Sequence, residues 1–144
     1  MTEVLRQVTA VAIKGRAVLI EGPPGSGKST LALTLIDRGA ILVGDDGVAL
    51  EERGGVLWAG PPLATEGRLE VRGVGLVTVP AAAAPVALVL KAHGDPPRFV
   101  EAAGETEIAG FAIPSLPFDL HADGAALRAE YALTLHGLPH GGSI

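Results

Sequence analysis

One eight-residue segment, from residue 22 to residue 29, has the composition and spacing of a phosphate-binding loop. It reads Gly-Pro-Pro-Gly-Ser-Gly-Lys-Ser and matches the pattern G-x-x-x-x-G-K-[ST] in full. Glycines allow such a loop to wrap closely enough for its backbone N–H groups to contact phosphate oxygens. Lys28 would reach the β- and γ-phosphates of a nucleotide, and the hydroxyl of Ser29 would bind Mg²⁺. The residues expected to hold the phosphates are Gly22, Pro23, Pro24, Gly25, Ser26, Gly27, Lys28, Ser29 and Thr30.

The elements expected on either side of this loop are those that a phosphate site needs. Residues 17–21 contain an apolar run that predicts a buried strand, and residues 30–38 predict a helix with one apolar face. Gly39 is placed to end that helix. Because a strand, a glycine-rich turn and a helix follow one another in this order, the match predicts a phosphate site rather than a chance glycine-rich turn.

Two adjacent aspartates, Asp45 and Asp46, are the candidates for the acidic partners of the loop. They follow a short strand predicted over residues 41–43, and one helix and one return strand would bring them back beside the loop. We expect one aspartate to help hold Mg²⁺ and the other to act as general base on an acceptor hydroxyl. An ordinary Asp-Asp-Gly turn is the alternative. Glu70 and Arg72 alternate on a further predicted strand, where they could bind metal and phosphate or simply form a surface ion pair.

The remaining sequence predicts many short strands and few helices. Two hairpins are expected, one with its turn at residues 15–16 and one with its turn at residues 52–55. Further predictions are a linker over 81–85, a central strand over 86–90, one or two weak strands within 99–113, a final helix over 124–135 N-capped by Asp123, and a frayed tail over 138–144. So much strand around a single loop helix predicts an α/β fold with a mixed, strand-rich sheet, in a single domain over residues 1–144.

Composition narrows the class of protein. The 144-residue chain is 48% hydrophobic but only 3% aromatic, has no cysteine, and has a net charge of −5 with the charges interspersed. Because it lacks a basic patch, we do not expect nucleic-acid binding, and no apolar run is long enough to span a membrane. We expect a cytoplasmic protein without disulfides. No two histidines are spaced i, i+4, so no histidine metal site is predicted from His93, His121, His136 and His140.

These segments closely resemble the catalytic domain of the HPr kinase/phosphorylase family. Residues 35–40, Leu-Ile-Asp-Arg-Gly-Ala, and residues 42–46, Leu-Val-Gly-Asp-Asp, are similar to the family motifs "LIxRG" and "LVADD". Residues 69–76, Leu-Glu-Val-Arg-Gly-Val-Gly-Leu, resemble the family signature "LEIRGLGI". The resemblance covers roughly residues 7–79 and is closest to the short form of the family, which lacks an N-terminal domain and occurs in alphaproteobacteria.

The resemblance implies a kinase that uses ATP and Mg²⁺ to phosphorylate a serine of HPr, the small phosphocarrier of the sugar phosphotransferase system. It also implies removal of that phosphate by phosphorolysis, with inorganic phosphate or pyrophosphate in the loop. The metal ligands it implies are Ser29, Glu70 and Asp45, and the catalytic residues are Asp46, Asp45 and Lys28, with Asp46 as the general base. The family forms hexamers, and its fold is related to that of phosphoenolpyruvate carboxykinases, so a homo-oligomer with a mixed sheet is expected.

Two positions depart from the family pattern. Gln7 stands where many members have a histidine, and Gln cannot supply a proton or a positive charge near neutral pH. Glu130 stands where the family has an active-site arginine, with Arg128 nearby, and the change removes charge that would stabilise a transferring phosphoryl group. One alternative is therefore a nucleotide- or phosphate-binding regulatory module with reduced or lost transfer activity. Another is a small-molecule kinase, although the chain has few arginines to build an acceptor pocket.

Overall fold

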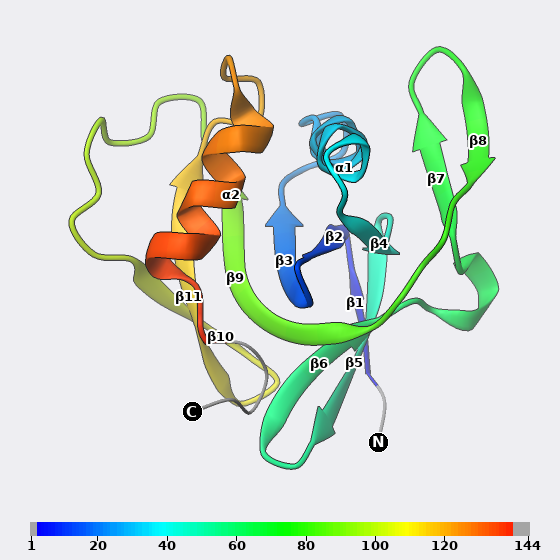
Figure 1. Ribbon diagram of the computed structural model, residues 1–144, viewed down its shortest axis with the longest axis horizontal. Coiled ribbons are helices and arrows are strands. Elements are labelled where there is room, and N and C mark those ends of the chain that lie inside the picture. Colours follow the sequence, from blue (N-terminus) through cyan, green and yellow to red (C-terminus); the bar gives the residue numbers. More distant parts are fainter. Residues whose placement is uncertain (1–2, 140–144) are drawn as a thin grey trace.

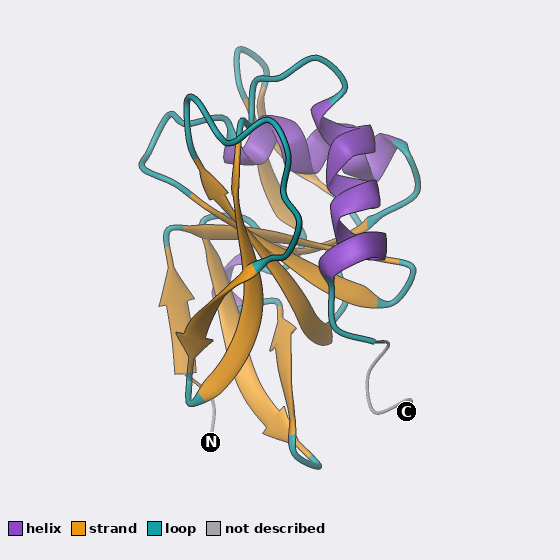
Figure 2. Ribbon diagram, turned by 90° about the vertical axis from the view of Figure 1, so that its left-hand side faces the viewer, coloured by secondary structure: helices purple, strands orange, loops and turns teal. Residues whose placement is uncertain are grey.

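The computed structural model describes residues 3–139, in which a mixed β-sheet has two helices on one face (Figures 1 and 2). This arrangement confirms the predicted strand-rich α/β fold. The strands are β1 (Glu3–Arg6), β2 (Val8–Ile13), β3 (Arg16–Glu21), β4 (Ile41–Gly44), β5 (Gly47–Arg53), β6 (Val56–Gly60), β7 (Arg68–Val71), β8 (Gly75–Thr78), β9 (Ala84–Ala92), β10 (Gly104–Ile108) and β11 (Phe111–Phe118). The helices are α1 (Lys28–Asp37) and α2 (Ala125–His136), with a short 3₁₀ turn η1 at Leu63–Thr65.

Nine of the strands within residues 3–139 form one sheet, and β7 and β8 pair as a separate hairpin. The path of the large sheet is β1-β5-β6-β9-β3-β2-β4, with β11 paired to β9 and β10 paired to β11. β9 runs parallel to both β3 and β11, so the carboxyl ends of these three strands lie at the same edge. Figure 1 shows that α1 begins at this edge, directly after β3. The edge at which parallel strands end is where open α/β sheets bind their ligands.

Both predicted hairpins form. β2 and β3 pair antiparallel around Lys14 and Gly15, one residue earlier than predicted, and β5 and β6 pair around Gly54 and Gly55. All four turn residues have a positive φ, between 49° and 83°. Two-residue hairpin turns of type I′ have a positive φ at both positions, and their backbone twist matches the twist of the strands. The hairpin of β2 and β3 places the loop after β3 next to the start of β2.

β9 joins the two parts of the sheet. Its first residues pair with β6, Pro85 lying opposite Trp58, and from Val86 onward it pairs with β3. The predicted linker over residues 81–85 is therefore wrong at Ala84 and Pro85. Proline has no N–H to donate to a ladder and is confined to strand starts and edges, and here it lies near the start of β9, where only two residue pairs connect to β6. The weak strands predicted within 99–113 are β10 and β11, and β11 continues to residue 118.

Aliphatic side chains fill both faces of the sheet. On β3, Val18 and Ile20 pack in the core beneath the two helices, whereas Ala17 and Leu19 pack in the core on the opposite face. All four are fully buried. Because successive side chains of a strand point to opposite faces, an unbroken apolar run needs cover on both sides. The run that precedes the loop thereby fixes β3 at the centre of the molecule.

The ends of the two helices differ in how well the sequence predicts them. α1 ends as predicted, because Gly39 takes a left-handed φ of 108° and its N–H and that of Ala40 bind the last-turn carbonyls of Ile36 and Leu35. α2 is capped not by Asp123 but by Gly124, which has a φ of 69° that glycine adopts without strain, and no side chain bonds the cap. Within residues 3–139, no helix is long and apolar enough to cross a membrane.

The segment after α2 is anchored to the sheet. The N–H of Leu138 donates to the carbonyl of Ala87 at 2.9 Å, and its own carbonyl accepts from Nη1 of Arg16 at 3.0 Å. Leu138 is also half-buried against both halves of the core. The prediction of a frayed tail is therefore wrong at Leu138, whose contacts on β9 were not visible in the sequence. Residues 140–144, which include His140, lie outside the described residues.

Candidate functional site

The loop over residues 22–27 has the geometry of a phosphate cradle. It connects β3 to α1, and it turns through a hydrogen bond from Ser26 N to Pro23 O and through left-handed backbone at Gly25 and Gly27, with φ of 79° and 102°. α1 begins at Lys28 and the N–H of Leu31 already binds the carbonyl of Gly27. The N–H groups of the first turn are left without helical partners, which makes them available to an anion.

Two side chains of the cradle lack the partners that a phosphate would supply. Lys28 is only 6% exposed, and its ammonium donates to the loop carbonyl of Gly22. The buried hydroxyl of Ser26 has no hydrogen-bond partner among the described residues. A buried hydroxyl without a partner costs stability unless a ligand or a water satisfies it. A phosphate in the cradle would provide acceptor oxygens to both groups, so these residues fit a bound polyphosphate.

Asp45 is held beside the cradle by three donors. The hydroxyl of Ser29 donates to Oδ1 at 2.6 Å, the hydroxyl of Thr9 donates to the same oxygen at 3.0 Å, and the backbone N–H of Glu70 donates to Oδ2 at 3.1 Å. The carboxylate is thus tied to α1, β2 and β7 at once. The aspartate pair is therefore not a turn remote from the loop, because one member is bonded directly to the loop serine.

Asp46 is held quite differently. It is exposed, and its backbone takes a left-handed φ of 60°. Its N–H donates to the Thr9 hydroxyl at 3.2 Å and its carbonyl accepts from the N–H of Gln7 at 3.1 Å. Among residues 3–139, no side-chain hydrogen bond to the Asp46 carboxylate is found. The two aspartates thus have different environments, one with its oxygens occupied and the other open.

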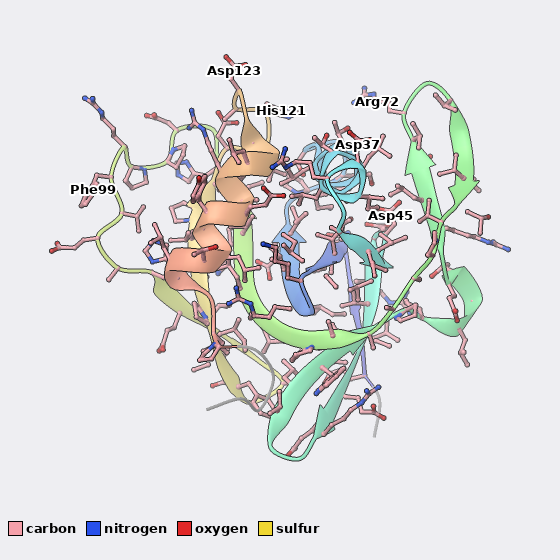
Figure 3. All side chains as sticks on the ribbon, in the orientation of Figure 1. Asp37, Asp45, Arg72, Phe99, His121 and Asp123 are labelled. Carbon is pink, nitrogen blue, oxygen red and sulfur yellow. The ribbon has the colours of Figure 1, made fainter. Side chains whose placement is uncertain are left out.

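The β7–β8 hairpin forms the far wall of the site. A cavity of about 610 Å³ is lined by the loop, both aspartates, Glu70 and Arg72. We expected Glu70 and Arg72 on one strand, but β7 ends at Val71 and Arg72 lies in the turn. Within the described residues Glu70 and Arg72 do not form an ion pair, so the alternative interpretation as a surface ion pair is not observed. Figure 3 shows Arg72 on the side of the hairpin that faces α1.

A magnesium ion would be held here by few protein ligands. Within residues 3–139, no group of three or more His, Asp or Glu side chains has metal-binding geometry. The predicted ligands Ser29, Asp45 and Glu70 do line the same cavity. Because Mg²⁺ in nucleotide sites is bound by one or two carboxylates together with phosphate oxygens, this sparse set fits a metal that arrives with a nucleotide.

Comparison with known families agrees with this geometry. The family model described as the HPr serine kinase C-terminal domain matches residues 2–84, which is more than half of the chain. The chain belongs to the HPr serine kinase C-terminal domain family. The matched segment includes β1 to β8 and every residue that lines the 610 Å³ cavity. The resemblance drawn from residues 7–79 is thereby confirmed.

Individual relatives of this HPr kinase-family chain are similar over the same segment. It is 49% identical over 71 residues to the HPr kinase/phosphorylase of Clostridium novyi, and 51% identical over 71 residues to that of Clostridium acetobutylicum. These stretches are 49% of this chain and 23% of each relative, so the chain spans about a quarter of the curated relatives it matches. A solved structure of the Hpr(Ser) kinase/phosphatase from Coxiella burnetii superposes with a TM-score of 0.76, covering 92% of both chains at 24% identity. That likeness shows the same fold over most of the chain.

The two positions that the resemblance singled out, Gln7 and Glu130, do not line the cavity. Gln7 is an exposed residue between β1 and β2, with a left-handed φ of 61°. Glu130 lies on α2 and accepts two hydrogen bonds of 2.9 Å from the guanidinium of Arg38, at the end of α1. These hydrogen bonds, followed by the charge of Glu130, raise the pKa of Arg38. Glu130 therefore ties the two helices together and does not contact the cradle.

Sequence reasoning missed two residues that contact the site. Thr9 is fully buried and bonds both aspartates, but an isolated threonine in an apolar strand gave no signal. His121 lies in the segment between β11 and α2, and its ring packs on the loop so closely that a Cβ on Gly27 would lie 2.8 Å from the imidazole Cε1. A pair of metal-binding histidines on a helix shows an i, i+4 spacing in the sequence, whereas a single ring packed on a glycine leaves no such pattern.

Proposed function

We propose that this chain transfers the γ-phosphoryl group of ATP to a serine hydroxyl of an HPr-like phosphocarrier protein, and removes it again by phosphorolysis. The observation that supports this most directly is the 2.6 Å hydrogen bond between Ser29 and Asp45, with the open carboxylate of Asp46 in the same cavity. This arrangement would supply a phosphate cradle, a pair of metal ligands and a separate base. The names of the relatives, HPr kinase/phosphorylase, agree with it.

The site residues have two kinds of role, the binding of phosphate and metal and the transfer of a proton. The loop N–H groups and the ammonium of Lys28 would hold the β- and γ-phosphates. Ser29, Asp45 and Glu70 would hold Mg²⁺, which neutralises the charge of the phosphates when it is bound. Asp46 would take the proton of the serine hydroxyl as the new O–P bond forms, while the bond between the γ-phosphorus and the bridging oxygen breaks and ADP leaves. In the reverse direction inorganic phosphate attacks the phosphoserine, and Asp46 returns the proton to the departing serine oxygen while pyrophosphate is released.

The assignment of the base to Asp46 rests on the contrast between the two carboxylates. Both oxygens of Asp45 already accept hydrogen bonds, which suits a group that positions a metal. The Asp46 carboxylate is exposed in the cavity wall, where an acceptor hydroxyl could approach it. The resemblance further suggests a cytoplasmic homo-oligomer, and we propose a hexamer on that basis alone.

Transfer is tested with labelled ATP, Mg²⁺ and an HPr-family protein from the same organism. Label should appear on a serine of the acceptor and should be released as pyrophosphate when inorganic phosphate is added. Asp46→Asn should abolish transfer with little change in ATP binding, whereas Lys28→Ala should weaken binding itself. Transfer that survived Lys28→Ala would contradict the role of the loop. Equal loss of ATP binding in the Asp45→Asn and Asp46→Asn variants would contradict the division of roles between the two aspartates.

A second candidate function is a phosphate- or nucleotide-binding regulatory module without transfer activity. It is favoured by Glu130, which by the resemblance takes the place of the family arginine and is paired with Arg38. Loss of that arginine would remove charge stabilisation from the transferring group. Tight binding of ATP to the wild-type chain, with no label on any acceptor, would identify this function instead.

A further inference from the structure

A second cavity adjoins the phosphate cradle on the side away from the aspartates. It has a volume of about 450 Å³ and lies between α1 and the start of α2. Thr30 lines both this cavity and the cradle, so the two are connected at the first turn of α1. In Figure 3, Asp45 and His121 lie on opposite sides of α1. A ligand that crosses the start of α1 would therefore have one end at each of them.

The orientation of a nucleotide in such a loop is set by its phosphates. The lysine reaches the β- and γ-phosphates and the serine hydroxyl lies at the metal, so the γ-phosphate points toward Asp45 and Asp46. The α-phosphate then lies toward Thr30, and the nucleoside must leave the cradle beyond it. The groove between α1 and α2 is the cavity that begins at Thr30 on that side.

The walls of this groove suit a nucleoside. Its floor is apolar, formed by Leu31 and Leu120, which are 2% and 7% exposed. One wall is His121, which is exposed to the groove on one side and packed against Gly27 on the other. Nucleobases stack readily on aromatic side chains. The volume lies within the range of ligand pockets, about 300–1,000 Å³.

We propose that the groove between α1 and α2 is the nucleoside subsite, with the base stacked on the ring of His121. This inference rests on the proposed nucleotide binding and adds to it the place and the residue that hold the base. His121 follows β11 and the loop follows β3, and both strands end at the same edge of the sheet through their shared neighbour β9. Strands distant in sequence thus supply the two halves of one nucleotide site.

The test compares ATP with inorganic tripolyphosphate, since the latter has the phosphates but no nucleoside. Calorimetry in Mg²⁺ gives both dissociation constants for the wild type and for His121→Ala. The substitution should weaken ATP binding by roughly 5- to 150-fold, the range expected for losing one stacked base, and change tripolyphosphate binding by less than about twofold. His121→Phe should restore ATP binding, because it keeps an aromatic ring. Thr34→Arg, which fills the groove from α1, should also weaken ATP alone.

His93→Ala is the matched control. His93 follows β9 at the same edge, and its ring accepts a hydrogen bond only from Asp95 N within its own turn, among the described residues. It lines neither cavity and should leave both ligands unaffected. Thermal unfolding of each variant shows whether it is folded.

The outcomes separate the two proposals. An equal loss of ATP and tripolyphosphate affinity in His121→Ala would make His121 a phosphate contact and would overturn the nucleoside subsite. Unchanged affinity for both ligands in His121→Ala and Thr34→Arg would overturn it as well. A wild-type chain that bound tripolyphosphate as tightly as ATP would show that no nucleoside subsite exists, while leaving the phosphate cradle intact. A wild-type chain that bound neither would refute the proposed function itself.

Discussion

Thr9→Val tests whether one buried hydroxyl holds the acidic side of the site together. Thr9 has no exposed surface, donates to Oδ1 of Asp45 at 3.0 Å and accepts from the N–H of Asp46 at 3.2 Å. Valine has nearly the same shape but can make neither bond. Two polar groups would then lose a partner at the point where β4 turns into β5.

The loss in the free energy of unfolding of Thr9→Val can be worked out from these two hydrogen bonds. A hydrogen bond to a charged group contributes about 1.5–3 kcal/mol, and a neutral one about 0.5–1.5 kcal/mol. Asp45 is half-exposed and keeps its bonds from Ser29 and Glu70, so the lower end of each range applies. Thr9→Val should therefore lower the free energy of unfolding by about 2 kcal/mol. That is a large fraction of the roughly 5–15 kcal/mol by which a domain is stable.

Thr9→Ser is the control, because it keeps the hydroxyl and removes one buried methyl group, at a cost of about 1 kcal/mol. Urea unfolding followed by circular dichroism gives the free energy of unfolding of each variant. Binding of ATP and Mg²⁺ should weaken in Thr9→Val and not in Thr9→Ser, since Asp45 loses a positioning contact only in the former. If the serine variant were as damaged as the valine variant in both measurements, the threonine would act through packing and the reasoning would be refuted.

Four further substitutions or removals have defined outcomes. Gly27→Ala places a Cβ in left-handed backbone and against the imidazole ring of His121. The unfolding midpoint should therefore fall by at least the equivalent of about 1–2 kcal/mol. An unchanged midpoint would contradict that packing. Glu130→Arg alone should destabilise the chain, because it places two positive charges together. The double exchange with Arg38→Glu should restore stability. If it did not, the ion pair would not contribute to stability. A chain ended after Gly137 loses both hydrogen bonds of Leu138 and should lose about 2 kcal/mol in urea unfolding, whereas an unchanged midpoint would support a frayed tail. Removal of Mg²⁺ with EDTA should abolish ATP binding in calorimetry, and metal-independent binding would contradict the ligand set of Ser29 and Asp45.

The sequence predicts the elements around the loop well because their signals are local. The apolar run of β3, the helix that ends at Gly39 and the glycines of the two hairpins each specify a conformation within a few residues. The pairing of Pro85 with β6 and of Leu138 with β9 depends on segments far away in the chain, and so neither was predicted. Asp123 is an effective N-cap in isolation, but the neighbouring glycine took the cap position.

In the candidate site, too, the sequence predicts what depends on local signals and not what depends on distant segments. A pattern of eight residues and a pair of aspartates specify which groups meet, since one helix and one strand return the chain to the loop. They do not specify how the environments of the two aspartates differ. That difference arises from Thr9 and from the N–H of Glu70, which reach Asp45 from β2 and β7. His121 is hidden for a similar reason, because only the parallel pairing of β9 and β11 brings its strand to the loop.

The charges around the cradle determine how a nucleotide can enter it. Among residues 3–139, the ionised side chains that line the cavity are two cations, Lys28 and Arg72, and three carboxylates, Asp45, Asp46 and Glu70. Their formal charges sum to −1, so these side chains alone do not neutralise a polyphosphate, and the loop N–H groups supply only partial positive charge. Glu130 lies on α2, where it is paired with Arg38 and supplies no positive charge to the cradle. A divalent cation bound between the carboxylates and the phosphates is then the remaining source of compensating charge. Nucleotide and metal must therefore bind together, and the base on His121 would supply the part of the affinity that does not depend on charge.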